Sequence, residues 1–139
     1  MVDCQKVYVS KSLFSSKNNE FLGVFAKTDI KKDELIEKGI VRLLSDGENS
    51  FFDGMNNPYV FTWSNDIPNY KWAIGSGCST FYNTALEKDA NTRMVRYFKE
   101  NKFEIFAKKD IKKDEELTHT YKSLLWRSSF IDLYKNLLK

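Results

Sequence analysis

Residues 106–121 read FAKKDIKKDEELTHTY, and the first twelve of these positions nearly repeat residues 25–35, which read FAKTDIKKDEL. Each copy begins with a short apolar run that is typical of a β-strand, and continues through a charged turn into a second short strand. Near-copies in so short a chain indicate an internal repeat. The repeat predicts two similar strand-turn-strand arms, near residues 23–36 and 103–117, on either side of a middle segment.

The turn of each arm carries its own signals. Asp33 and Asp114 stand where a turn favours Asp, Asn or Gly. Ile30 and Ile111 are isolated apolar residues within the charged turns, so we expect each of them to pin its turn to the core. We interpret all four as structural residues without chemistry of their own.

The segment between the arms has a different character, and we expect residues 45–72 to be variable. Residues 45–57 are polar and contain glycine, which is typical of a loop. Residues 58–63 read PYVFTW and predict a strand. Residues 90–107 predict a hairpin with its turn at Glu100 and Asn101.

The C-terminus predicts one helix over about residues 128–138. Its apolar residues recur at helical spacing and form one stripe: Phe130, Leu133, Tyr134, Leu137 and Leu138. Ser129, with Asp132 three residues later, is a plausible start signal. Many short strands and one terminal helix predict a mostly β fold of the α+β class.

Composition limits the class of protein. The chain has 139 residues, 42% hydrophobic and 15% aromatic, which suits one domain over residues 1–139. Its formal net charge is only +3 with both signs interleaved, which argues against a nucleic-acid-binding protein. We expect an intracellular protein without a membrane partner, because no apolar run has the length of a membrane span and no signal peptide is evident. Cys4, Cys78 and His119 are too few and scattered for a zinc site, so no metal is expected.

Residues 115–121 (EELTHTY) closely resemble the Glu-Glu-Leu-Thr-x-x-Tyr segment of SET domains. Three further segments resemble that family in the right order: residues 23–26 (GVFA), residues 59–63 (YVFTW) and residues 79–91, which contain STFYNTA and DAN. The resemblance covers essentially the whole chain. It is closest to the compact viral and bacterial SET proteins, which lack pre-SET and zinc-binding post-SET regions.

The resemblance implies a fold, a reaction and a cofactor. The fold is several small β-sheets around a pseudoknot, with a C-terminal helix. The reaction is methylation of a lysine on a protein or peptide partner, such as a histone tail, with S-adenosyl-L-methionine as the methyl donor. The cofactor and the lysine enter from opposite faces and meet through a narrow channel.

Transfer of a methyl group from a sulfonium to an amine suits the residues of this chain. The amine has to be neutral, aligned with the methyl group and shielded from water. An apolar, aromatic channel disfavours the ammonium form, and so lowers the pKa of a lysine within it. Such a site needs tyrosines, carbonyl groups and a close approach at a glycine, but it needs no His/Asp pair.

The resemblance assigns candidate roles residue by residue. Tyr121 matches the catalytic tyrosine, with a buried core tyrosine as the structural alternative. The matches to cofactor-binding positions are Leu22, Gly23, Tyr82, Asn83, Thr84 and Trp126. The matches to the channel for the substrate lysine are Tyr59, His119, Tyr121 and Leu125. Trp126 is equally suited to anchoring the terminal helix, and a lone histidine such as His119 is more often structural.

The chain also departs from the family pattern. Phe21 replaces the first glycine of Gly-x-Gly, Thr84 replaces the histidine of Asn-His-Ser, and Leu125 stands where viral relatives have a second channel tyrosine. Residues 86–88 lengthen the next loop, and Ala90 replaces a proline. These changes bear on cofactor affinity and rate more than on the fold.

Three functions therefore compete. The leading hypothesis is a protein-lysine N-methyltransferase, and the alternative is a catalytically degenerate SET domain that acts as a protein-binding or regulatory module. A small nucleic-acid-binding β protein is the third, and it predicts steeply salt-dependent binding to DNA or RNA. The terminal helix is interpreted as a lid over the cofactor, as a homodimer contact or as simple packing on a monomer.

Overall fold

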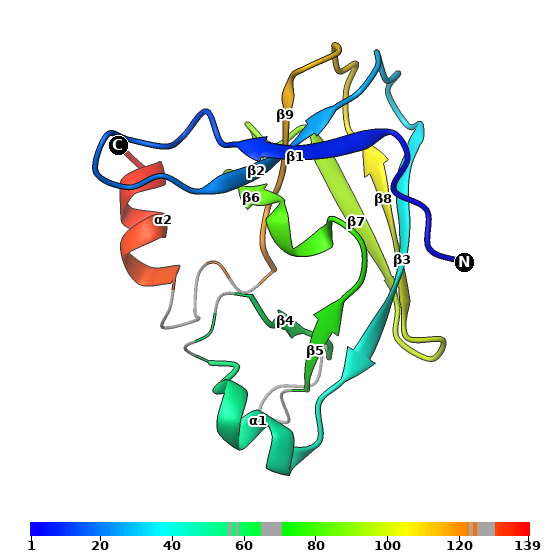
Figure 1. Cartoon of the computed structure of the whole chain (residues 1–139), viewed down its shortest axis with the longest axis vertical. Coiled ribbons are helices and arrows are strands. Elements are labelled where there is room, and N and C mark those ends of the chain that lie inside the picture. The colour runs from blue at the N-terminus through cyan, green and yellow to red at the C-terminus, as the bar shows by residue number, and fades with distance from the viewer. Residues whose placement is uncertain (56, 58, 65–70, 123, 125–129) are drawn as a thin grey trace.

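The computed structural model describes residues 1–55, 57, 59–64, 71–122, 124 and 130–139. Within these residues, nine strands form two small sheets that curve around a common core (Figure 1). The first sheet has the order β1 (Val7–Lys11), β2 (Leu22–Ala26), β9 (Glu116–His119) and β6 (Asn83–Thr84). The second has the order β4 (Phe61–Thr62), β5 (Trp72–Gly75), β3 (Leu35–Leu43), β8 (Lys102–Ala107) and β7 (Thr92–Tyr97). The helices are α1 (Asp46–Phe52), the 3₁₀-helix η1 (Ser79–Phe81) and α2 (Ile131–Leu137).

The two arms of the repeat are present and lie side by side, at the top of Figure 1. Ile30 and Ile111 exchange a pair of main-chain hydrogen bonds of 2.8 and 2.7 Å, and both side chains are buried. The prediction that these residues pin the turns is therefore confirmed, and they do so against each other.

The charged ends of the turns repeat this reciprocal pattern. Asp33 and Asp114 both adopt positive φ, at 69° and 67°, a conformation that Asp tolerates better than most residues. The Asp33 N–H donates to the carbonyl of Ala107, and the Asp114 N–H donates to the carbonyl of Ala26. Each turn thus closes onto the strand of the other arm, so the repeat forms one interlocked unit.

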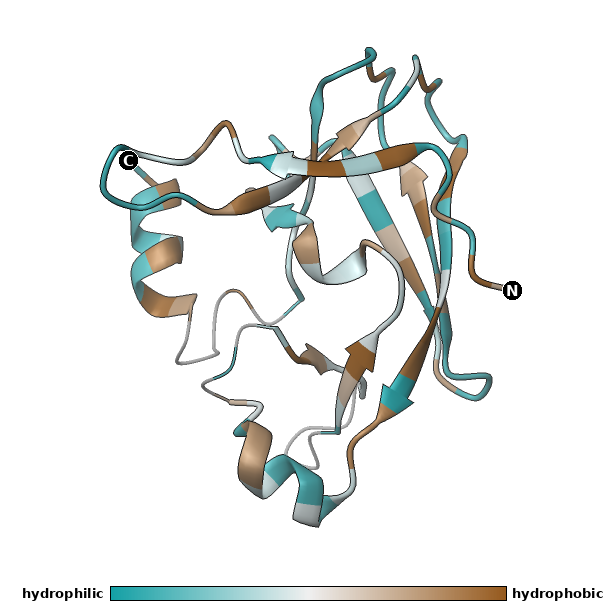
Figure 2. Ribbon diagram, in the orientation of Figure 1, coloured by the Kyte–Doolittle hydropathy of each residue, from teal (hydrophilic) through white to brown (hydrophobic). Residues whose placement is uncertain are grey.

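The core lies between the sheets and is built by strands of both arms. Val24 on β2, Phe103 and Ile105 on β8, and Leu117 on β9 are all buried. Figure 2 shows apolar residues along β2, β5 and β8, whereas the turns that leave β2 and β8 are mainly hydrophilic. The alternating burial of β8 is the expected pattern of a strand with one face on a core.

The structure corrects the prediction of a loop over residues 45–57, because α1 begins there. Ser45 caps this helix: its hydroxyl accepts from the Glu48 N–H, while the Glu48 carboxylate accepts from the Ser45 N–H. This reciprocal arrangement is a capping box, and its spacing was visible in the sequence. The helix ends at Asp53, which adopts the left-handed conformation.

Other predicted elements agree in kind and differ in extent. The hairpin of β7 and β8 is confirmed, and Asn101 in its turn has positive φ. The predicted strand over residues 58–63 is reduced to the two residues of β4, and residue 58 lies outside the described residues. The C-terminal helix is confirmed but begins after Phe130 without a side-chain cap, and Ser129 lies outside the described residues.

In the described part of the chain, no helix combines the length and the apolar character that a membrane crossing requires.

Candidate functional site

Strands β6 and β9 lie far apart in the sequence but pair in parallel, and the site is built where they meet. Their register places Thr84 beside His119. Just beyond β9, the main-chain N–H of Tyr121 donates to the Thr84 hydroxyl at 3.0 Å. The Tyr121 hydroxyl donates to the main-chain carbonyl of Tyr82. Both the backbone and the ring of Tyr121 are therefore fixed against the segment that contains β6.

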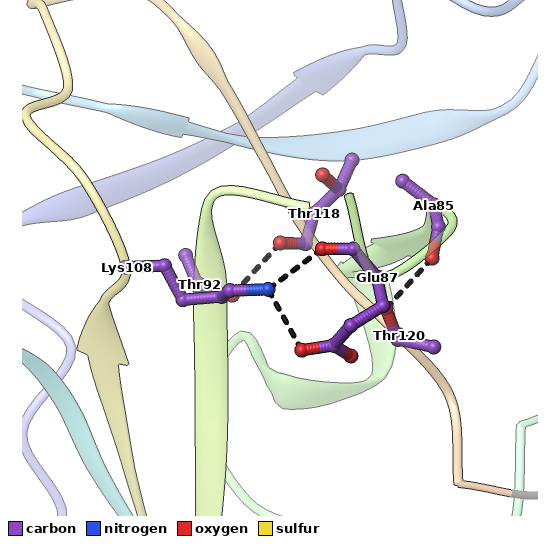
Figure 3. Close-up of polar contacts among 6 residues, drawn as sticks. All are labelled: Ala85, Glu87, Thr92, Lys108, Thr118 and Thr120. Carbon is purple, nitrogen blue, oxygen red and sulfur yellow. Dashed lines mark hydrogen bonds and ion pairs between the residues drawn. The ribbon is translucent and has the colours of Figure 1, made fainter. Parts of the chain in front are cut away.

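The loop after β6 is held by side-chain hydrogen bonds (Figure 3). The Thr120 hydroxyl donates to the carbonyl of Ala85 at 2.9 Å. Lys108 donates from its ammonium group to both the carbonyl and the carboxylate of Glu87, at 2.8 and 2.9 Å. The lengthened segment at residues 86–88 is thus tied to the β8–β9 arm, which keeps it in place next to Thr84 and Tyr121.

Two cavities share a wall at this point. The larger has a volume of about 760 Å³, and its lining includes Leu22, Tyr59, Asn83, Thr84, Tyr121 and Leu133. The smaller has a volume of only about 30 Å³. Its lining includes Phe61, Met94, Arg96, His119, Tyr121 and Lys122. Thr80, Tyr121 and Phe130 line both. Tyr121 therefore borders both cavities.

Asn83 belongs to a buried polar cluster around the carboxylate of Glu116. Its side-chain NH₂ donates to Glu116 Oε2 at 2.9 Å and to the carbonyl of Leu22 at 3.1 Å. Ser12 and the Leu13 N–H also donate to this carboxylate. A Cβ atom on residue 23 would overlap Glu116, so the close approach that requires Gly23 is to this internal carboxylate.

Tyr82 directs its side chain into the core. Its ring is almost fully buried, and its hydroxyl donates to Glu37 Oε1 at 2.9 Å. The other oxygen of Glu37 accepts from the Cys78 N–H at 3.1 Å. Burial is the main cause that raises the pKa of Glu37 to about 7, and burial followed by the nearby Glu37 raises that of Tyr82. Tyr82 contributes to the site only its main-chain carbonyl, which accepts the hydrogen bond from the Tyr121 hydroxyl.

His119 is a neutral residue of the smaller cavity. Its side chain is 5% exposed, and its ring lies 5.2 Å from the ring of Tyr121. Burial, with a smaller contribution from Arg96, lowers its pKa to about 3. The imidazole therefore stays uncharged at neutral pH, and among the described residues its Nδ1 atom has no hydrogen-bond partner.

The remaining candidates divide into two groups. Tyr59 is 70% exposed and forms part of the wall of the larger cavity, on the same side as Asn83. Leu125 and Trp126 lie outside the described residues.

Sequence reasoning missed two residues of the site. Phe130 lies against the Tyr121 ring at 5.1 Å between centroids, and the apolar stripe of the terminal helix had already marked it as an inward-facing residue. Arg96 lines the smaller cavity from β7, and nothing in the local sequence distinguishes it from an exposed strand arginine such as Arg93.

Comparison with known proteins agrees with this fold and geometry. The SET domain family model matches residues 22–122, and the chain belongs to that family. A candidate histone methyltransferase of Plasmodium falciparum has a TM-score of 0.60 and 24% identity, over 87% of this chain and 96% of its own. A humanized mutant of Polycomb Repressive Complex 2 from Chaetomium thermophilum, bound to the inhibitor GSK126, has a TM-score of 0.65 and 25% identity. That match covers 84% of this chain and 15% of the other. No curated protein matches the sequence.

The family match supports a methyltransferase role for the chain. The structural likenesses confirm the predicted SET fold of small sheets with a short terminal helix.

Proposed function

We propose that this chain is an S-adenosylmethionine-dependent protein-lysine N-methyltransferase, with histone tails as the first substrate class to test. The observation that carries the proposal is the meeting of the two cavities at Tyr121. One cavity is large enough for a nucleoside-sized ligand, and the other is narrow and partly apolar, as an alkylamine requires. A methyl donor and an acceptor would therefore approach the same hydroxyl from different sides.

The larger cavity fits S-adenosylmethionine in size and in lining. It combines aromatic side chains, which suit an adenine ring, with polar groups, which suit an amino acid and a ribose. The NH₂ group of Asn83 is committed to Leu22 and Glu116. Its amide oxygen accepts no hydrogen bond from the described residues. This oxygen is therefore the atom of Asn83 that could accept a hydrogen bond from the amino group of a ligand. The bound cofactor would supply an electrophilic methyl group.

The acceptor side has to deliver a neutral amine. Phe61, Met94 and Phe130 make part of the small cavity apolar, which disfavours an ammonium ion by desolvation. His119 is uncharged at neutral pH, so it supplies no negative charge that would stabilise an ammonium ion. The nitrogen lone pair forms the new N–C bond while the C–S bond breaks, and the resulting ammonium releases its proton to solvent. Tyr121, held by the Tyr82 carbonyl, orients the amine during this step.

The test is calorimetric titration with S-adenosylmethionine and S-adenosylhomocysteine, followed by transfer of a labelled methyl group to histone-tail peptides. We expect one-site binding in the micromolar range and label on peptides that contain lysine. Peptides with every lysine replaced by arginine are the control. A folded protein that binds neither nucleoside would contradict the proposal, and would favour a module that binds proteins without catalysis.

A further inference from the structure

Arg96 contributes a positive charge to the lining of the smaller cavity. It lies on β7 opposite Phe103 of β8, a core residue, so its side chain is directed to the inner side of the sheet. Its Nε atom is buried and, among the described residues, has no hydrogen-bond partner. A buried guanidinium nitrogen without a hydrogen-bond partner costs stability, which marks Arg96 as a residue whose position needs an explanation.

Among the described residues, no carboxylate that lines the smaller cavity neutralises Arg96. Lys122 and the uncharged His119 line the same cavity, and no carboxylate is among its described lining residues. On the neighbouring β8 strand, the Glu104 carboxylate accepts from the Tyr97 hydroxyl. The other charged groups nearby lie over aromatic rings: Lys102 over Tyr97, at 5.1 Å, and Arg93 over Phe106, at 4.6 Å.

We propose that Arg96 keeps the acceptor lysine deprotonated, because a positive charge at the wall of the smaller cavity disfavours an ammonium ion within it. This inference rests on the proposed function and adds a residue to it. The neutral amine is little affected by the charge, so the equilibrium between the two forms shifts toward the nucleophile. The guanidinium also disfavours retention of the charged methylated product.

The chain contains a reporter of this effect. Lys122 lines the same cavity, and its pKa is lowered first by burial and then by the charge of Arg96. A lysine that enters the cavity from a substrate would meet the same guanidinium. Lys122 is therefore an amine within the chain on which the effect of the Arg96 charge can be measured.

Removing the Arg96 charge should change both kcat and KM, each for its own reason. The acid limb of kcat reports the pKa of groups in the enzyme–substrate complex, including the bound lysine. Replacing Arg96 by an apolar residue should raise that pKa by about one unit, the low end for a charge within about 4–6 Å. At a pH below the limb, kcat should then fall about tenfold, because one pKa unit changes the neutral fraction by that factor. KM should fall with it, because the substrate ammonium is no longer repelled.

The first experiment compares the pH profiles of kcat for four proteins: the unmodified chain, Arg96→Met, Arg96→Lys and the control Arg93→Met. We expect the acid limb to move upward by about one pH unit in Arg96→Met only, because Arg96→Lys retains the charge. Methyl transfer by Arg96→Met with an unshifted limb would overturn the inference and leave the proposed function standing. Absence of transfer by the unmodified chain would overturn both.

The second experiment does not depend on turnover, so it tests the effect of Arg96 on a lysine pKa even if Arg96→Met is inactive. Lysine side chains are labelled with ¹³C at Cε, and the Lys122 signal is followed by NMR as the pH is raised. Its pKa should rise in Arg96→Met and stay unchanged in Arg93→Met. An unchanged Lys122 titration in a folded Arg96→Met protein would overturn the inference.

Discussion

The hydroxyl of Tyr121 donates a hydrogen bond to the main-chain carbonyl of Tyr82, which lies 39 residues earlier in the chain. The bond holds the ring of a residue that lines both cavities, and it joins the end of β9 to the segment before β6. Tyr121→Phe keeps the ring and removes only this donor. We expect methyl transfer to fall by about 10²-fold or more, because positioned donors at a reacting centre have effects of that size.

The same variant should keep its fold and its affinity for S-adenosylhomocysteine, since one hydrogen bond contributes only about 1 kcal/mol to stability. Tyr97→Phe is the matched control, because it removes a tyrosine hydroxyl that donates to Glu104 on the hairpin. Equal loss of transfer in both variants would show that Tyr121 acts through stability alone.

Asn83 supports the buried carboxylate of Glu116 as well as the larger cavity. In Asn83→Asp a second carboxylate would replace an NH₂ group that now lies 2.9 Å from Glu116 Oε2. We expect the unfolding free energy at pH 7 to drop by about 1–3 kcal/mol, because a donor is lost and like charges meet. Asn18→Asp, at an exposed position, is the control and should change stability little.

The loss in Asn83→Asp should be partly recovered on acidification. Two neighbouring carboxyl groups share a raised pKa in the folded state, so folding takes up a proton and is favoured as the pH falls. Chemical denaturation at pH 7 and pH 5 measures this. A deficit that is the same at both pH values would mean that Glu116 and residue 83 do not interact as described.

Glu37 makes stability depend on pH near neutrality. Burial raises its pKa from 4.5 to about 7, so the folded chain holds a proton that the unfolded chain releases at lower pH. The stabilising contribution of the carboxyl is complete below its unfolded pKa and is lost as the pH rises toward 7 and above. Glu37→Gln should remove this decline, which amounts to roughly 2–3 kcal/mol between pH 4.5 and pH 8.

Urea denaturation across this range measures the slope in both proteins. Glu34→Gln is the control, because the Lys6 ammonium lowers the pKa of Glu34 and gives it the opposite dependence, confined to acid pH. A wild-type slope that survives in Glu37→Gln would assign the pH dependence to another group.

The repeat made the arms of this fold predictable, because its signals are local. Ile30 and Ile111 stand out as apolar residues in charged turns, and Asp33 and Asp114 occupy positions where the chain needs a left-handed residue. Their reciprocal pairing was not predictable, since it depends on the approach of two distant turns. Helix α1 was missed for a different reason: its capping box was overlooked in a polar, glycine-containing stretch.

The site was predictable only through the resemblance to a family. Tyr121, Asn83 and Thr84 are brought together by a parallel pairing of two short strands, and no periodicity in the sequence indicates such a contact. Arg96 matched no family motif, and its burial depends on the pairing of β7 with β8. Sequence alone therefore could not separate it from Arg93, the exposed arginine of the same strand.

The terminal helix bears directly on cofactor binding. Leu133 and Leu137 on α2 line the larger cavity, although none of the residues in α2 is buried. In the double variant Leu133→Ser/Leu137→Ser, affinity for S-adenosylhomocysteine should fall about tenfold, as lost apolar contact worth about 1.4 kcal/mol implies. The melting temperature should change little, because these side chains are not part of the core.

Leu138→Ser is the control for this variant, since Leu138 is 61% exposed and is not part of the cavity wall. Calorimetry then separates the three interpretations of the helix, together with light scattering and thermal melts. Weaker binding with unchanged mass and melting identifies a lid over the cofactor, because only the ligand contact has been lost. A change in mass identifies a dimer contact, and a lower melting temperature with unchanged affinity identifies simple packing. Of these outcomes, the position of Leu133 and Leu137 in the wall of the larger cavity favours the first.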